Sequence, residues 1–267
     1  MQLRDVFTKS IHDQWRPMLA WSVFAAGLPA LYVALYPSFG STSVMQEFMD
    51  QLPEAYRALF SSTGLDLSTA EGFLNIELFS FVGPLLLLAV GIALGAGATA
   101  AEEESGTADL LLANPVRRWR VVVEKAAAML LWTAATAAAI WVGVALASVA
   151  VGVDLRLERV AAALADCALL GMAFGGVAMA IGALVGRRMP ALAISLGLAV
   201  VAYFINALAP LITGMTGWRV ISPFYWYIGN DPLRNGIEPI HAVALAAVAA
   251  AGIAVAAVAW ERRDIRG

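Results

Sequence analysis

Few residues in this chain carry side chains that do acid–base or covalent chemistry. The two histidines, His12 and His241, are far apart in sequence, and Cys167 is the only cysteine. This excludes a disulfide within the chain and a cysteine-based metal cluster, and a histidine metal site is not expected. Lys9 and Lys125 are the only lysines, and neither follows a glycine-rich loop that cradles phosphates. The sequence therefore predicts no catalytic residue, no metal site and no ATP hydrolysis by a P-loop mechanism.

The composition points to a membrane protein. Of the 267 residues, 61% are hydrophobic and only 14% are charged, against roughly 25% charged in soluble domains. Six apolar runs, each near the ~20 residues needed to span hydrocarbon, are expected at about 18–36, 79–99, 126–151, 161–185, 191–213 and 239–260. Each must be helical, because backbone groups in lipid need partners within their own segment. The predicted fold is an all-α integral membrane protein in which residues 1–267 form one transmembrane domain.

The distribution of Lys and Arg predicts the orientation of these spans. One side of the expected topology carries twelve: Arg4, Lys9, Arg16, Arg117, Arg118, Arg120, Lys125, Arg187, Arg188, Arg262, Arg263 and Arg266. The other side carries five: Arg57, Arg156, Arg159, Arg219 and Arg234. The positive-inside rule therefore predicts that both termini and the loop over residues 100–125 lie in the cytoplasm.

The most densely charged segment, residues 102–125, lies between the second and third apolar runs. Gly106 is expected to break the preceding helix. Thr107 can then cap a new short helix, and Asp109 suits the positive end of its dipole. This helix ends before Pro115 because the residue preceding a proline is pushed out of the α region. The expected product is a leucine-rich helix of about two turns, roughly 10 Å long.

The same segment resembles a loop of a known family. Its pattern Glu-x-Glu-x-Gly-Thr-x-Asp-x-Leu-Leu-x-x-Pro-x-x-Arg, with a lysine seven residues later, is similar to the first cytoplasmic loop of type-two ABC exporter permeases. Ala108 and Asp109 depart from the Leu-Glu of the family pattern without changing the character of the helix. In that family the loop is a coupling helix that docks into a separate ATPase subunit. The resemblance assigns this role to Glu102, Glu104, Gly106, Thr107, Asp109, Leu111, Leu112, Pro115, Arg118 and Lys125. An ordinary loop on the lipid surface is the alternative.

Two outer loops are expected, over residues 37–78 and 214–238. The first contains short amphipathic pieces and is either a solvated cap or a lid over a substrate exit. The second is aromatic, and its Ser-Pro-Phe-Tyr and Asp-Pro-Leu-x-x-Gly motifs again resemble these permeases, where the loop re-enters the outer membrane face as short helices. An aromatic belt at the interface is a compatible interpretation. The outer-loop candidates are Pro223, Tyr225, Trp226, Asp231 and Arg234.

Three smaller features complete the prediction. Residues 1–16 have apolar side chains near one face and are expected to form an interfacial helix, with a frayed terminus as the alternative. Asp166 is the one acid well inside an apolar run, and is either an interfacial, hydrated residue or a polar contact in a translocation path. Glycines four apart, at 91 and 95, 171 and 175, and 182 and 186, are interpreted as packing positions between helices.

The resemblance implies a permease subunit of an ATP-driven exporter in the cytoplasmic membrane of a bacterium. Its partners would be an ABC ATPase, which binds ATP and Mg, and a second copy or a homologous permease; no nucleic acid is expected. A hydrophobic or amphipathic substrate, such as a drug, an antibiotic or a lipid, fits the apolar spans. The alternative is an ATP-independent secondary transporter, which needs charged groups near mid-membrane. An intramembrane enzyme is less favoured, because no nucleophile and base pair is present.

Overall fold

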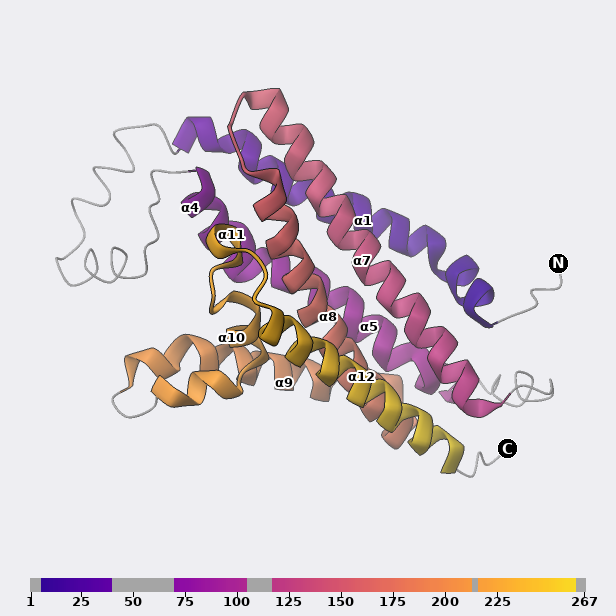
Figure 1. Ribbon diagram of the computed structural model, residues 1–267. Helices are drawn as coiled ribbons and strands as arrows, with labels where there is room; N and C mark the ends of the chain where they lie inside the picture. Colours follow the sequence, from indigo (N-terminus) through magenta and orange to yellow (C-terminus); the bar gives the residue numbers. More distant parts are fainter. Residues whose placement is uncertain (1–5, 40–69, 105–116, 213–215, 263–267) are drawn as a thin grey trace.

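The computed structural model describes residues 6–39, 70–104, 117–212 and 216–262, and these residues are almost entirely helical (Figure 1). The described residues contain no β-strand. Within these described ranges, six helical segments are long and apolar enough to cross a membrane: Val6–Ser38, Glu71–Glu102, Arg118–Val151, Leu157–Val185, Arg188–Leu208 and Pro239–Arg262. The predicted all-helical fold with six spans is confirmed.

The spans are formed by six long helices. Helix α1 covers Val6–Phe39, and the second span consists of α4 (Ala70–Leu74), a π-helix η1 (Asn75–Val82) and α5 (Gly83–Glu104). The remaining spans are α7 (Arg118–Val151), α8 (Leu157–Val185), α9 (Arg188–Leu208) and α12 (Pro239–Arg262). Between α9 and α12 lie the short helices η2 (Ala209–Leu211), η3 (Thr216–Ile221), α10 (Pro223–Ile228) and α11 (Pro232–Asn235).

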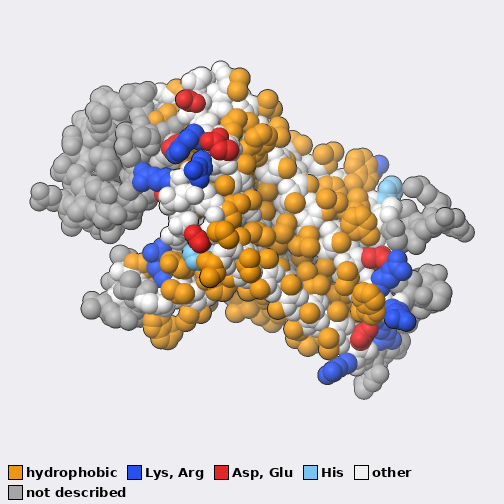
Figure 2. Space-filling model, in the orientation of Figure 1, with side chains coloured by type: hydrophobic (Ala, Val, Ile, Leu, Met, Phe, Trp, Pro, Cys, Tyr) orange, Lys and Arg blue, Asp and Glu red, His pale blue; other side chains and the backbone are white. Residues whose placement is uncertain are grey.

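The bundle has two distinct ends. Both chain termini and the helix ends that flank residues 105–116 lie at one end, which we call the termini end (Figure 1). Helices α4, α10 and α11 lie at the opposite end, which we call the hairpin end. Charged side chains gather at these two ends, and an apolar surface covers the helices between them (Figure 2). This distribution is the one expected of a protein whose middle faces hydrocarbon.

The helix boundaries differ from the prediction in three places. A separate interfacial helix over residues 1–16 is not confirmed, because α1 runs without a break from Val6 through Pro17 into the first span. Helix α7 begins at Arg118 rather than near residue 126, since a helix continues through charged residues that find partners outside the hydrocarbon. The second span includes α4, Ala70–Leu74, which the prediction placed within the first outer loop.

Helix α8 lies at the centre and contacts each of the long helices α5, α7, α9 and α12. Glycines allow the backbones of α5 and α12 to approach the backbone of α8 most closely. A Cβ added at Gly91 of α5 would overlap the carbonyl of Gly171, and one at Gly171 would lie 2.7 Å from the carbonyl oxygen of Leu87. On another face, a Cβ at Gly176 would lie 2.5 Å from the carbonyl oxygen of Ala249 in α12. The interpretation of glycines 91, 95, 171 and 175 as packing positions is confirmed.

Replacing Gly91 by Ala should force α5 away from α8. The added methyl group has no room beside the Gly171 backbone, and overpacking of this kind costs about 1–3 kcal/mol. Gly197→Ala in α9 is the matched control, because a Cβ there meets nothing within 4 Å and alanine favours the helix. Thermal unfolding in detergent should show a lower Tm for Gly91→Ala and an unchanged or higher Tm for Gly197→Ala. Equal Tm values for the two variants would contradict the close contact.

Candidate functional site

The predicted coupling segment is described only at its two flanks. Glu102 and Glu104 lie in the last turn of α5, Arg118 begins α7, and Lys125 lies further along α7. The remaining predicted coupling residues lie outside the described residues and stay a prediction: Gly106, Thr107, Asp109, Leu111, Leu112 and Pro115. The contacts of the two flanks nevertheless show which other helices a movement of the segment would displace.

An ion pair ties the two flanks together. The Nζ of Lys125 lies 2.6 Å from Oε1 of Glu102, and it also donates a hydrogen bond of 2.6 Å to the carbonyl oxygen of Ala98. The exposed fractions of the two charged side chains are 11% and 17%. Removing one partner of such a covered pair leaves the other charge poorly solvated. The end of α5 and the start of α7 are therefore held as one unit.

Two carboxylates near this unit cap the first turns of two other helices. Oε1 of Glu104 accepts a hydrogen bond of 2.9 Å from the backbone N–H of Arg188, at the start of α9. Oε2 of Glu124 accepts hydrogen bonds of 2.7 and 3.0 Å from the backbone N–H groups of Val6 and Phe7, at the start of α1. Such groups have no partner within their own helix, and a negative charge is favoured at this end of the dipole.

Glu124 was not among the residues that sequence reasoning selected. The sequence signal was limited to its i,i+4 spacing from Arg120, and their side chains do form an ion pair of 2.7 Å. A cap between residues more than a hundred positions apart has no local signature. With Glu104, it joins the flanks of the predicted coupling segment to α9 and to α1.

At the hairpin end, α10 carries three of the predicted outer-loop residues. Pro223 occupies the first position of α10, where a missing N–H costs nothing. The Tyr225 ring lies 5.4 Å from the Arg219 guanidinium and 5.4 Å from the His241 ring. Nε1 of Trp226 donates a 2.9 Å hydrogen bond to the carbonyl oxygen of Val220. These aromatic side chains therefore fasten short helices to one another, in agreement with the predicted short helices of this loop.

We call η3, α10 and α11, residues 216–235, the hairpin. The other two predicted residues, Asp231 and Arg234, lie where the hairpin meets the second span. Oδ1 of Asp231 accepts a 3.0 Å hydrogen bond from Nδ2 of Asn75, in η1. Nε of Arg234 lies 3.6 Å from Oδ2 of the same carboxylate. A further ion pair with two hydrogen bonds, between Arg156 and Glu71 at 2.8 and 3.1 Å, connects the loop before α8 to α4.

Tyr227 is a residue that sequence reasoning missed. Its side chain is 2% exposed, and its hydroxyl donates a 2.8 Å hydrogen bond to the carbonyl oxygen of Phe79 in the π-helix. Burial raises the pKa of the Tyr227 phenol well above its ordinary value, so the hydroxyl stays protonated and able to donate. This contact seats α10 on the second span. An aromatic run gives no signal of which ring turns inward.

Asp166 lies beneath this hairpin, in α8. It is 3% exposed, and its Oδ1 has no hydrogen-bond partner within the described part of the chain. The burial argues against the interfacial, hydrated interpretation. A role in a translocation path stays a proposal.

An apolar cavity of about 250 Å³ lies between the second span and α9, near the hairpin end. Its surface is almost entirely apolar, formed by aliphatic and aromatic side chains. The lining residues are Ser80, Phe81, Pro84, Leu85, Leu88, Ala89, Leu196, Ala199, Val200, Tyr203, Phe204 and Phe224. Because α9 contributes five of these side chains, a shift of α9 would change the shape of the cavity.

Comparison with known families identifies the class of protein. A model of the ABC-2 family transporter proteins matches residues 7–265, which is nearly the whole chain. The chain belongs to the ABC-2 family of transporter proteins. No curated protein matches the sequence significantly. Membership in the ABC-2 family agrees with six membrane-spanning helices, and ABC-2 membrane proteins generally work with an ATPase partner and as dimers.

Replacing Tyr227 by Phe should loosen the hairpin. The variant leaves the Phe79 carbonyl buried without its partner, which costs about 1–3 kcal/mol. The matched control is Tyr225→Phe, two residues away in the same short helix, because no hydrogen bond of the Tyr225 hydroxyl is seen among the described residues. Hydrogen exchange of α10 amides should rise for Tyr227→Phe and stay near wild type for Tyr225→Phe. Unchanged exchange in Tyr227→Phe would show that the bond does not hold the hairpin.

Proposed function

We propose that this chain is the permease subunit of an ATP-driven exporter, with residues 102–125 forming the contact with a separate ATPase. Family membership supports a transport subunit. The observation that carries the proposal further is the set of contacts around the loop flanks. Glu102 pairs with Lys125 across the loop, and Glu104 caps α9. A displacement of the coupling segment would therefore be transmitted to α9, which lines the apolar cavity.

The mechanism follows from this connection. ATP would close two ATPase subunits beneath two permease copies and displace the coupling helices. Because Glu104 at the end of α5 holds the first turn of α9, displacement at the termini end would move these two helix ends together and tilt α9 against the part of α5 that the Gly91–Gly171 contact holds on α8. The cavity lies between those two helices, so its volume would change with each cycle. ATP and Mg would be bound by the partner ATPase, and this chain would supply the path.

The apolar lining of the cavity favours one class of substrate. Its aromatic and aliphatic lining offers burial to an apolar group, and the few polar groups there offer little to a strongly charged one. A hydrophobic or amphipathic molecule, such as a drug, an antibiotic or a lipid, fits that lining. Export from the cytoplasm places the termini end inside the cell, as the excess of Lys and Arg there favours.

One observation favours a second candidate, an ATP-independent secondary transporter. Asp166 is an acid buried within a span, and such residues mark ion or proton paths in carriers of this kind. The two functions differ in their energy source. Uptake of a lipophilic dye into inside-out vesicles should require ATP and the co-expressed ATPase if the chain is an ABC permease. Uptake that follows a proton gradient without ATP would favour the carrier.

Replacing Leu111 by Gly should weaken the contact with the ATPase. Burial of one leucine is worth about 1.5–3 kcal/mol, so its loss from a covered position lowers association roughly ten- to a hundredfold. The matched control is Ala108→Gly, which lowers helix preference by about 1 kcal/mol but removes only a methyl group. Co-purification with an ATPase encoded beside the permease should fall for Leu111→Gly and much less for Ala108→Gly. Full retention of the ATPase and of transport in Leu111→Gly would reduce the segment to a loop on the lipid surface.

A further inference from the structure

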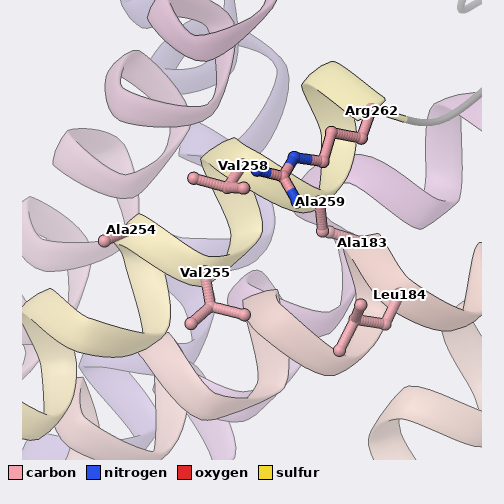
Figure 3. A pocket seen from close by; sticks show the side chains of 7 residues that line it. All are labelled: Ala183, Leu184, Ala254, Val255, Val258, Ala259 and Arg262. Carbon is pink, nitrogen blue, oxygen red and sulfur yellow. The ribbon is translucent and has the colours of Figure 1, made fainter.

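A groove of about 650 Å³ opens between α8 and α12 at the termini end (Figure 3). Its walls are aliphatic side chains of the last turns of both helices, and one charged group, Arg262, completes the lining. The residues are Ala183, Leu184, Ala254, Val255, Val258, Ala259 and Arg262. None of these residues belongs to the cavity between α5 and α9 or to the flanks of the coupling segment.

The packing of the two helices explains why the groove forms. Gly176 and Gly252 bring the backbones of α8 and α12 into direct contact about midway along the spans. Helices that touch closely at one point and cross at an angle separate on either side of it. Two turns beyond the contact, small residues at 183 and 259 leave the space unfilled. The groove is therefore a consequence of the same glycines that hold the bundle together.

The chemistry of the groove matches one kind of molecule. From Ala254 to Arg262 the wall is about 12 Å long at 1.5 Å per residue, which fits within one leaflet of a hydrocarbon core about 30 Å thick. Arg262 lies at the end of the wall, and Figure 3 shows its side chain reaching back over the groove toward Val258 and Ala259. An apolar slot that ends in a guanidinium suits an acyl chain joined to a phosphate.

Charge near the mouth favours an anionic molecule over a neutral one. No carboxylate of the described residues forms an ion pair with Arg262. The exposed Arg187 follows α8 directly, at the same end of the bundle, whereas the Arg188 side chain lies beside Gly97 of α5. Glu261 is the nearest acid in sequence, but successive residues of a helix point about 100° apart. A basic pocket between spans on the cytoplasmic side is a recurrent site for anionic headgroups.

We propose that this groove binds an anionic phospholipid, with one acyl chain along α8 and α12 and the headgroup phosphate on Arg262. The site is separate from the proposed transport path, so the bound lipid is a structural partner rather than cargo. It fills the space that the glycine contact leaves open, and it anchors the end of α12 to the membrane surface.

The test uses the full-length permease, delipidated in detergent and titrated with phosphatidylglycerol or phosphatidylcholine, with binding counted by native mass spectrometry. Wild type should bind one phosphatidylglycerol with clear preference over phosphatidylcholine. Arg262→Gln should weaken phosphatidylglycerol binding about fivefold, as expected for one cation at a membrane surface. Ala254→Phe should block the groove and abolish that binding event.

Matched controls separate the site from the general lipid surface. Ala246→Phe adds the same ring to an exposed position of α12 outside the groove, and Arg16→Gln removes a cation from α1. Both should bind phosphatidylglycerol as wild type does. Equal binding of the two lipids, or equal phosphatidylglycerol binding by wild type and Arg262→Gln, would overturn the proposal. Loss of a permease dimer in Ala254→Phe without loss of lipid would instead assign the groove to a second copy.

Discussion

Direct backbone contact between α8 and its neighbours is the constraint on which the rest of the structure depends. In lipid, hydrophobic burial does not draw helices together, so association relies on close packing and polar contacts. Gly91 and Gly171 provide that packing toward α5, and Gly176 and Gly252 provide it toward α12. Because α8 is held on two faces, the hairpin end and the termini end each form around a fixed centre.

Side-chain contacts fasten the helices to one another at both ends of the bundle. At the termini end, Glu104 and Glu124 accept hydrogen bonds from the first N–H groups of α9 and α1. At the hairpin end, the Tyr227 hydroxyl and the Asn75 side-chain amide donate the hydrogen bonds that link the short helices to the second span. Ion pairs contribute at the hairpin end as well, between Arg156 and Glu71 and between Arg234 and Asp231.

The sequence predicts this fold well wherever the signal is local. Span number follows from length and hydropathy, and the packing role of Gly91, Gly95, Gly171 and Gly175 follows from their spacing. Gly176 and Gly252 were not predicted, and Gly186 of the pair 182 and 186 ends α8 in a left-handed conformation. The prediction fails where the deciding contact is distant. Residues 1–16 were expected to form their own interfacial helix because their pattern is amphipathic, yet α1 runs from Val6 through Pro17 into the first span. The π-helix, the cap by Glu124 and the inward turn of Tyr227 arise from contacts with residues many positions away, which no local pattern records.

The same distinction separates the candidate sites. The resemblance of residues 102–125 to a coupling loop selected Glu102, Glu104 and Lys125, and the structure shows that these three bind across helices. Asp166 was recognised as unusual because it interrupts an apolar run, but its burial beneath α10 depends on the tertiary fold. The apolar cavity has no sequence signature, since its walls come from η1, α5, α9 and α10, which are separate segments of the chain.

The central claim is that Glu104 carries motion of the loop to α9. Spin labels at Val149 of α7 and Val201 of α9, both exposed side chains, report the distance between these helices in the complex with the ATPase. The account predicts that ATP shifts this distance in wild type, and that Glu104→Ala abolishes the shift while the ATPase stays bound. Glu261→Ala, which removes an exposed glutamate at the same end, should leave the shift intact. An ATP-dependent shift that persists in Glu104→Ala would contradict the account.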